Sequence, residues 1–573
     1  MELLERSATM NGREEPAWER TRLRVPRESG TFLIHPEPSS IVRHVDQLCD
    51  QQEFAGSADC QILNVGLSEF RAAARSEVLT AASQWTSELL GRTVDVQVAA
   101  PLIMTGHQPE LFHPGVFAKN VATSQLASQA NGVGLNLVVD NDLLASTQVR
   151  IPVGDRENPG ISTIDFDTAR PPLPWEEACV SDTRLLGAFA DRVSAAMAKW
   201  NIEPVVAEFW PKVMATAAER STDSKSAALV ECLTAGRASL EYEWGLGNLE
   251  LPISRLCETE TFRSFAAHIL VHAEEFRRVY NQVLSEYRRV NRIRSSSHPV
   301  PQLELQDDWC ETPFWIWRAD TPRRGRLFVR RDGETLELAT APQPSAIVHS
   351  VMLSSDVTAD EATAVLQRLS EAGLRIRTRA LTTTLFSRLC LCDLFIHGIG
   401  GAKYDAMTDR IVSRFFGVAL PEYLTLSATE WLSIGEPHSV TTPDVSWLSQ
   451  MLRELQQNPQ RHLGPDPSAD VQALVVEKAS LIAEQHSARL TDPTFETSLR
   501  GHKRYRRFPE INRELAKQTE DQQRLIREEL THVEQSLAAN QTLMSREFSF
   551  CLYSGSTIQS MIKRLRSEFS LVE

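Results

Sequence analysis

Short apolar segments alternate with helical repeats along much of the chain, a pattern typical of α/β proteins. Residues 67–89 place apolar side chains at steps of three and four, which predicts an amphipathic helix that ends at Gly91. The apolar run 102–104 predicts a buried strand, and the helical pattern 116–126 follows it. A second core strand is expected at 135–139, so this order fits an open α/β sheet.

The same pattern resumes after a long interval. A strand is expected near 346–348, and the helix after it ends at Gly373. The apolar run 394–397 predicts another core strand, which a further helix follows. The run 390–392, which holds two cysteines, is also strand-like.

Other segments suggest strands outside this pattern. The valines within 94–98 alternate with polar residues, as in an exposed strand. Residues 314–318 and 326–330 flank a turn with proline and glycine, which predicts a hairpin. The run 548–553 predicts a strand that returns to the core.

From Pro443 onward the sequence predicts helices. One helix is expected from its N-cap Ser468 to about Leu490, and a longer one from Pro509 to Met544. The second half of the longer helix carries a heptad seam at Ile526, Leu530, Val533, Leu537, Asn540 and Met544. Polar residues interrupt the seam upstream, so we predict an antiparallel helical hairpin. We also expect it to join two copies of the chain as a homodimer.

These patterns divide the chain into an α/β core in two parts, a region inserted between them, and a helical tail. The predicted ranges are 1–91 (N-terminal arm and helix), 92–155 (first core part), 156–340 (inserted region), 341–442 (second core part), 443–547 (helical coiled coil) and 548–573 (return to the core). The inserted region would supply a lid or a substrate wall.

Composition narrows the class of protein. A chain of 573 residues is expected to hold several domains, and its net charge of -15 argues against a surface built to bind nucleic acid. The local basic runs 288–294, 323–326 and 503–507 are typical of solvated faces. Nine cysteines are scattered without a CxxC pair, so neither a zinc framework nor a disulfide scaffold is indicated. Residues 1–28 lack an apolar signal-like segment and no stretch has the length of a membrane span, so we expect a cytoplasmic protein without a membrane partner.

The segment 105–119 is the first candidate for chemistry. A strand, a glycine turn and a helix start place backbone N–H groups around an anion. Two histidines, a glutamine, a glutamate and a lysine lie in this segment. His107 has the right pKa range for a general base, and Lys119 could hold a carboxylate or phosphate. The alternative is a strand–helix connection whose polar residues only cap and hydrate.

Acidic residues end the next predicted strand. Asp140 and Asp142 would lie at the carboxyl edge of the sheet, beside the first candidate segment, where open α/β sheets bind ligands. If a nucleotide is consumed, their carboxylates could hold Mg²⁺. The alternative is that they only end the strand and begin a turn.

A second glycine-rich turn follows the strand 394–397. Residues 398–405 read Gly-Ile-Gly-Gly-Ala-Lys-Tyr-Asp, so Lys403 could meet a phosphate or carboxylate at a helix start. We expect the strand ends at Met104 and His397 to be neighbours in one parallel sheet. His107, Asp140, Asp142 and Lys403 would then line one crevice. The alternative for this turn is tight strand–helix packing.

Two sets of candidate residues result. The catalytic candidates are His107, Gln108, Asp140 and Asp142. The candidates for cofactor binding are Thr105, Gly106, His113, Lys119, Gly398, Gly400, Gly401, Lys403 and Tyr404. His268 and His272 stand one helical turn apart without the glutamate of an HExxH motif, so we expect a structural role and no protein-built metal site.

The stretch 105–119 resembles the signature turn of bacillithiol biosynthesis cysteine-adding enzymes. The stretch 397–404 resembles the second glycine turn of that family, and 443–573 resembles its coiled-coil tail. The likeness covers about half of the chain, mainly core and tail. A shorter likeness, to about Asp142, links the first motif to WbqC-like proteins, which are associated with amino-sugar modification.

The resemblance implies a Rossmann-like core with connecting insertions and a dimerising coiled coil. It also implies an enzyme that joins L-cysteine to the amino group of glucosaminyl-malate as an amide, with a site for a nucleotide such as ATP or ADP with Mg²⁺. The chain departs from the family in both turns. His107 stands where the family has glutamine, 113–118 replaces a longer element, and Ala402-Lys403 stands where the family has proline and glutamate.

Two other classes of function stay open at this point. The first is an RNA-binding protein that uses the basic runs and a synthetase-like core, and salt-dependent association with tRNA would favour it. The second is an inactive scaffold of the same fold, which would bind neither nucleotide nor amino acid.

Overall fold

The computed structural model describes residues 18, 23–48, 60–223, 225–491 and 499–570. These residues form two compact units. The first comprises Met1–Ile151, Ser162–Leu432 and Arg546–Glu573, and the second comprises Pro152–Ile161 and Ser433–Ser545. No helix among the described residues is long and apolar enough to cross a membrane.

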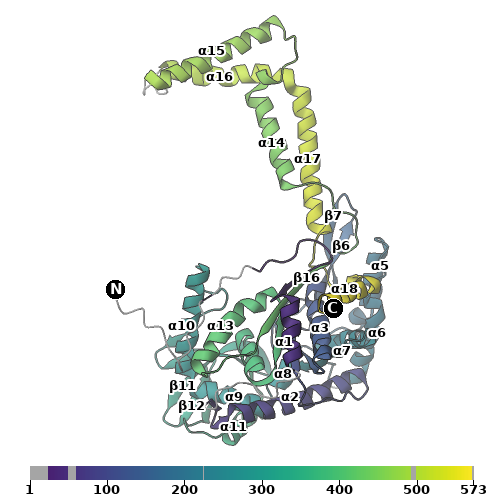
Figure 1. Cartoon of the computed structure of the whole chain (residues 1–573), viewed down its shortest axis with the longest axis vertical. Coiled ribbons are helices and arrows are strands. Elements are labelled where there is room, and N and C mark those ends of the chain that lie inside the picture. The colour runs from purple at the N-terminus through teal and green to yellow at the C-terminus, as the bar shows by residue number, and fades with distance from the viewer. Residues whose placement is uncertain (1–17, 19–22, 49–59, 224, 492–498, 571–573) are drawn as a thin grey trace. The chain divides into compact units, whose positions relative to one another are not determined.

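A six-stranded main sheet forms the centre of the first unit (Figure 1). Its order is β1 (Thr31–His35), β16 (Tyr423–Thr429), β15 (Leu394–His397), β4 (Leu102–His107), β5 (Val133–Val138) and β8 (Leu249–Pro252). All neighbours are parallel except β1, which pairs antiparallel with β16. The protein is therefore α/β with a mainly parallel sheet, as predicted.

Helices connect and cover these strands. The helices that bear most on the site are α2 (Leu67–Leu90), α3 (Pro114–Gln129), α7 (Leu229–Glu243), α8 (Ile253–Leu256) and α13 (Ile399–Phe415). The remaining helices of this unit are α1 (Pro38–Leu48), α4 (Thr183–Gly187), α5 (Phe189–Ala198), α6 (Val206–Arg220), α9 (Glu260–Val271), α10 (Ala273–Asn291), α11 (Ala359–Glu371), α12 (Ala380–Phe386) and α18 (Gly555–Glu568). The helices predicted at 67–89 and 116–126 are confirmed.

The chain adds strands to the sheet in opposite directions on the two sides of the β4–β15 pair. From β4 the chain passes through α3 to β5, on one side, whereas from β15 it passes through α13 to β16, on the other. Because such parallel crossovers are right-handed, α3 and α13 cover opposite faces of the sheet. A doubly wound sheet of this kind has its topological switch point between β4 and β15.

A second, antiparallel sheet lies in the same unit. Its order is β13 (Ile347–Met352), β12 (Thr335–Ala339), β11 (Thr321–Asp332), β10 (Trp309–Arg318) and β14 (Leu374–Thr378), with β9 (Leu305–Gln306) beside β10. The predicted hairpin 314–330 is confirmed as β10 and β11. The boundary predicted at residue 340 falls inside this sheet, between β12 and β13. Strand β8 lies within the predicted insertion 156–340, yet it belongs to the main sheet. Two short ribbons complete the strands, β2 (Gln61–Ile62) with β3 (Val65–Gly66) and β6 (Gln148–Gly154) with β7 (Pro159–Asp165).

Three predicted strands are wrong. Residues 94–98 form none, because the backbone of Val94 bonds to Ser83 and Ser87 of α2 instead of to a strand. Residues 387–391 continue α12 as a helical segment, since a short apolar run does not distinguish a buried helix from a strand. The segment 548–553 does return to the core, but as the short helix η7 (Phe550–Leu552), whose Phe550 N–H donates to the Phe112 carbonyl at 2.7 Å.

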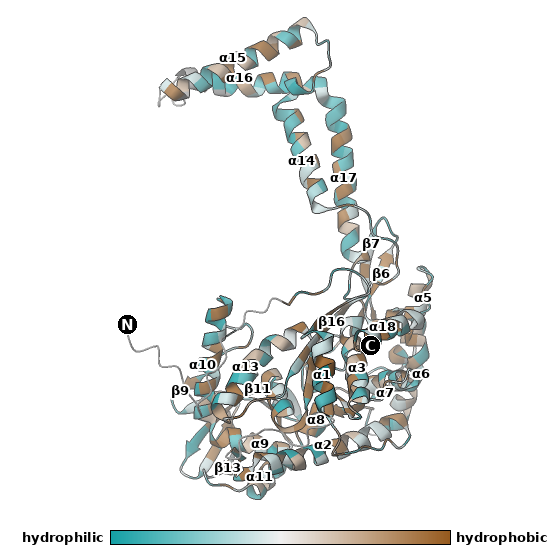
Figure 2. Cartoon of the chain, viewed as in Figure 1, coloured by the Kyte–Doolittle hydropathy of each residue, from teal (hydrophilic) through white to brown (hydrophobic). Residues whose placement is uncertain are grey.

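The second unit consists mainly of α14 (Thr442–Gln457), α15 (Ala469–Thr491), α16 (Leu499–Ala516) and α17 (Glu520–Leu543), in which hydrophilic and hydrophobic residues are mixed (Figure 2). The single helix predicted for 509–544 is wrong, because a 3-10 turn at Lys517–Thr519 separates α16 from α17. The side-chain amide of Asn540 accepts a hydrogen bond from the His438 N–H and donates one to the His438 carbonyl, each at 2.8 Å. Near the other end of α17, Thr519 contacts the Leu455 carbonyl of α14. Helix α17 therefore packs antiparallel to α14 of the same chain; of the predicted seam, Val533 and Asn540 are buried, whereas Met544 is exposed.

Candidate functional site

The carboxyl ends of β15, β4 and β5 meet at one edge of the main sheet. Phe395 is paired with Met104, and Ile396 with Thr105, so the predicted neighbourhood of the two strand ends is confirmed. On the other side of β4, His107 is paired with Val138. The switch point between β4 and β15 is thus bordered by the loops that begin at Gln108 and Gly398.

His107 and His397 nevertheless point to opposite faces of the sheet. Paired residues of parallel strands share a face and successive residues alternate. His107 shares the face of Thr105 and Ile396, whereas His397 lies one residue beyond Ile396. Accordingly, His107 bonds to Asn120 of α3, and His397 bonds to Asp405 of α13. The expected single crevice lined by His107 and Lys403 is therefore not formed.

A buried polar network holds His107 beneath α3. The His107 Nε2 atom lies 3.0 Å from the Asn120 side-chain oxygen, and Asn120 donates to Glu241 over 2.8 Å. Arg237 pairs with Glu241 at 2.9 Å and with Glu250 at 2.7 Å. The network joins α3 and α7 to the edge strand β8, and it ties the sheet to its helices.

The electrostatics of this network keep His107 uncharged. Burial, followed by the charges of Lys119 and Arg237, lowers the pKa of His107 well below its ordinary value. Its Nδ1 atom lies 3.0 Å from the Gln108 carbonyl, so both ring nitrogens are engaged. Burial also lowers the pKa of Lys119 to about 8, and its ammonium donates to the Gly106 carbonyl at 2.7 Å. Both side chains are thus buried and bound to other groups of the protein.

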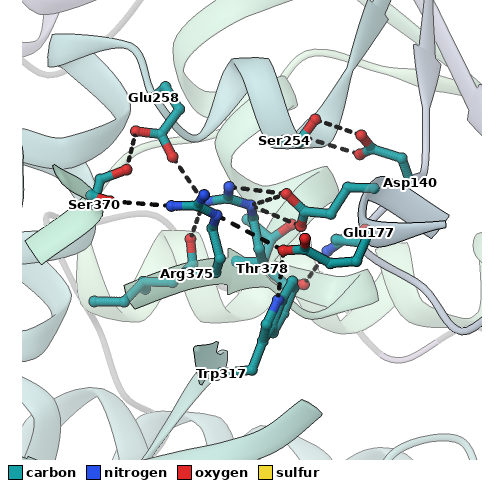
Figure 3. Close-up of polar contacts among 12 residues, drawn as sticks. Asp140, Glu177, Ser254, Glu258, Trp317, Ser370, Arg375 and Thr378 are labelled. Carbon is teal, nitrogen blue, oxygen red and sulfur yellow. Dashed lines mark hydrogen bonds and ion pairs between the residues drawn. The ribbon is translucent and has the colours of Figure 1, made fainter. Parts of the chain in front are cut away.

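Asp140 caps a helix from the end of β5. Its carboxylate accepts hydrogen bonds from the backbone N–H and the hydroxyl of Ser254, at the start of α8 (Figure 3). Burial, and next the charge of Glu176, raise the pKa of Asp140 to about 7. Since the side chain is buried and both oxygens are engaged, its role here is to fix the β5 loop.

An ion network surrounds this loop. Arg377 of β14 forms a bidentate pair with Glu176, with a shortest distance of 2.9 Å, and lies 3.1 Å from Glu258. Figure 3 shows the adjacent pair in which the Trp317 indole N–H donates to Glu177 over 3.1 Å. These contacts join the short helix η1 (Trp175–Glu177) to the second sheet.

The partly exposed part of the edge is built around Asp142. Gln108, from the loop after β4, donates to one carboxylate oxygen of Asp142 at 3.0 Å. Arg324 of β11 donates to the other oxygen at 2.8 Å. Burial opposes ionisation of Asp142, but these donors together lower its pKa below the ordinary value. The loops of neighbouring strands and the second sheet therefore converge on one carboxylate.

Aromatic and basic groups extend this cluster. The guanidinium groups of Arg324 and Arg379 lie 4.3 and 4.5 Å from the ring centre of Trp315. Arg379 also pairs with the buried Glu311 at 2.8 Å. Glu110 lies in the loop after β4 and is exposed as a whole residue. Partial burial of its carboxyl group, and next the negative charge of the nearby Asp142, raise its pKa. We call Gln108, Glu110, Asp142, Trp315, Arg324 and Arg379 the edge cluster.

The pair Asp140 and Asp142 does not fit Mg²⁺. Asp140 is committed to Ser254, and Asp142 faces Arg324, whose positive charge opposes a cation. Among the described residues, no group of three or more histidine, cysteine or acidic side chains is placed to hold a metal ion. His268 and His272 have other partners, since His268 Nδ1 accepts from the Leu63 N–H at 3.4 Å and His272 Nδ1 lies 2.8 Å from the His268 carbonyl.

A second buried cluster lies on the other face of the sheet, at the end of β15. His397 Nε2 bonds to Asp405, and Arg388 lies 3.3 Å from the same carboxylate and 2.7 Å from Asp409. Burial opposes ionisation of Asp405, but His397 and Arg388 lower its pKa below the ordinary value. The guanidinium of Arg388 also lies 4.9 Å from the ring centre of Tyr423.

The other predicted binding residues are distributed among several roles. Thr105 donates to the Ile396 carbonyl at 2.8 Å, and Gly106 packs against Leu137. His113 caps α3 by accepting the Gly115 N–H at 3.0 Å. Of the predicted second turn, Gly398 is the N-cap of α13, and Gly400, Gly401, Lys403 and Tyr404 are already helical. Because these residues already belong to α13, the expected free glycine turn is replaced by a helix start. Lys403 is exposed on this helix.

Sequence reasoning missed most residues of the edge cluster and the partners of His397. Arg324 stands in a basic run that the sequence presents as a solvated face, yet its side chain is 14% exposed and bound to Asp142. Asp405 lies eight residues after His397, in the stretch already singled out, so helical spacing from the strand end could have found it. Trp315 was predicted only as part of a hairpin in the inserted region, and Arg379 gave no signal, because the contact between them depends on how the second sheet forms.

No protein-family model matches this sequence, and no curated protein matches it significantly.

Proposed function

We propose that the protein is an enzyme that joins the carboxyl group of an amino acid to the amine of an amino sugar as an amide. The reaction would take place at the carboxyl edge of the main sheet, in a core that we infer to be Rossmann-like. The observation that carries the proposal is the switch point between β4 and β15, because doubly wound sheets bind small molecules outside the strand ends at that position.

The edge cluster supports substrates that carry both charges. Glu110 is an acceptor suited to an ammonium group, which an amino acid and an amino sugar both have. Arg324 and Arg379 are donors suited to a carboxylate, and a planar guanidinium can bind it through two hydrogen bonds. The resemblance described above adds cysteine and a glucosaminyl conjugate as the first substrates to test.

Each group of the edge cluster then has a defined task. Glu110 would orient the attacking amine, and Asp142, held by Gln108, would keep Arg324 in place. Arg324 would fix the carboxylate that becomes the amide carbonyl. Such positioning of two reactants contributes to the rate because it replaces a bimolecular encounter with a fixed geometry.

Amide formation removes one oxygen from the amino-acid carboxylate and two hydrogens from the attacking ammonium group. ATP, which the resemblance implies, stays part of the proposal as the co-substrate that takes up this oxygen, so that ADP and inorganic phosphate leave. ATP or ADP would bind with Mg²⁺ supplied from solution, because Asp140 and Asp142 do not fit the ion.

The test is direct. Purified protein is incubated with amino acids, glucosaminyl-malate and ATP with Mg²⁺, and the amide is detected by its mass. Arg324→Ala should lower product formation strongly, whereas Arg278→Ala, an exposed change on α10, should not. Absence of product with every amino acid, together with absence of amino-acid binding, would end the proposal and favour the scaffold alternative.

We also infer that the chain forms a homodimer through its second unit. Helix α17 packs against α14 within the chain, so the inference rests on other apolar side chains. Those that are more than half exposed in this unit are Trp447, Val476, Leu490 and Leu525. Equilibrium sedimentation of the whole chain tests this inference, and a monomer at all concentrations would contradict it.

A further inference from the structure

We propose that the first turn of α13 and the imidazole of His397 form a binding site for the phosphate group of a small molecule. The site lies at the carboxyl end of β15, on the side of the switch point opposite His107. It rests on the proposed function only in placing a small-molecule ligand at this edge of the sheet.

The start of α13 exposes unpaired backbone donors. The helix is 17 residues long, and its N-cap Gly398 provides no side-chain cap. The first backbone bond of the helix runs from Ala402 N–H to the Gly398 carbonyl at 3.1 Å. In the described part of the chain, the N–H groups of residues 399–401 have no hydrogen-bond partner. Together with the helix dipole, such donors attract an anion.

Glycines keep this helix start open. A Cβ atom added at Gly398 or Gly400 would meet no other heavy atom within 4 Å. At Gly401 it would lie 2.5 Å from His397 Nδ1, so that nitrogen lies against the first turn of α13 and only glycine permits the close approach. The ring nitrogen therefore lies beside the helix turn that carries the unpaired donors.

His397 supplies the observation that points to a ligand. The residue is only 4% exposed. Its Nε2 atom is held by Asp405, while Nδ1 has no partner among the residues that the structure describes. Because Asp405 fixes the ring, Nδ1 is directed at the first turn of α13. An imidazolium carries an N–H on each nitrogen, so Nδ1 can donate to an oxyanion while Nε2 donates to Asp405.

The surrounding charges favour an anion over a cation. The acidic groups behind the ring are Asp405 and Asp409, and Arg388 pairs with both of them. At the helix start itself, the groups that lack a partner among the described residues are three backbone N–H groups and Nδ1 of His397. A phosphate group, with several oxygens around one centre, matches several converging donors better than a planar carboxylate does.

The experiment measures binding of inorganic phosphate and pyrophosphate to the whole protein by calorimetry, with the histidine signals followed by NMR. Phosphate should shift the His397 ring signals of the wild type. His397→Gln should weaken binding about tenfold or more, as expected for loss of a charge-assisted donor. His349→Gln, at an exposed histidine of β13, is the matched control and should leave binding unchanged. Equal binding by H397Q and the wild type would overturn the proposal.

Two further arms keep the result unambiguous. Gly400→Ala adds a methyl group where the structure has open space, so it should fold normally and still weaken phosphate binding severalfold. Wild-type affinity in G400A would overturn the proposal even if H397Q failed to fold. Tighter binding of malate than of phosphate, with the same dependence on His397, would assign the site to a carboxylate and overturn it as well. None of these measurements requires amide formation, so failure of the proposed reaction would leave the site standing.

Discussion

The amide nitrogen of Gln108 and a carboxylate oxygen of Asp142 are 3.0 Å apart, although the two residues follow different strands. The contact closes the end of the β4–β5 pair and presents Asp142 to Arg324 of the second sheet. The contact is exposed and lies at the strand ends where we place the substrates.

Arg324→Ala should therefore weaken amino-acid binding by about 1.5–3 kcal/mol, the range for hydrogen bonds to charged groups. The fold should persist, because the partner carboxylate of Arg324, Asp142, is 40% exposed and can be solvated by water. Calorimetric titration with amino acids measures the effect, and Lys403→Ala is the control because Lys403 is exposed on α13. Equal losses in the two variants would argue against a specific role for Arg324.

The buried polar network beneath α3 should stabilise the fold and take no part in ligand binding. Arg237→Ala leaves Glu241 and Glu250 buried without their cation, which costs about 3–5 kcal/mol for a buried pair. A large fall in the thermal midpoint is expected, and circular dichroism measures it. A midpoint close to that of the wild type would show that water reaches the two carboxylates in the folded state.

The raised pKa of Asp140 predicts a pH dependence of stability. The folded carboxyl group holds its proton up to about pH 7, whereas an unfolded aspartate loses it near pH 4. Between these values the folded state binds more protons, so its stability should fall as pH rises from about 4 to about 7. Asp140→Asn should make denaturant midpoints at about pH 5 and about pH 8 more alike. An unchanged pH profile in D140N would assign the dependence to Glu250, whose pKa burial also raises to about 7.

Asn540 should hold α17 to the His438 loop. Asn540→Ala leaves the His438 N–H and carbonyl without their 2.8 Å partners, which costs about 1–3 kcal/mol for a buried polar group. Gln541→Ala, at the exposed neighbour, should change stability by less than about 0.5 kcal/mol. Faster hydrogen exchange in α17 of N540A alone would confirm the role, and equal exchange in both variants would contradict it.

Much of the fold could be predicted from the sequence, because helical and strand periods are local. The runs at 102–104, 135–139 and 394–397 gave the three central strands and their pairing. The alternating valines at 94–98 led to a wrong strand prediction, because the pattern does not show that Ser83 and Ser87 bond to the backbone of Val94. For the candidate site, the positions of Gln108 and Asp142 after predicted strands identified them as candidates, whereas no such position identified Arg324 or Trp315. Their contribution depends on how the second sheet packs, and no short-range pattern encodes that.

The bond from the Thr105 hydroxyl to the Ile396 carbonyl joins residues 291 positions apart. Until the ribosome has released β15 and β16, strands β4, β5 and β8 expose one apolar edge of an unfinished parallel sheet. Long-range pairing of this kind folds slowly and leaves such edges open to aggregation. Production of the protein should therefore depend on chaperones that shield nascent chains, and fragments that end before residue 394 should be recovered mainly as aggregates.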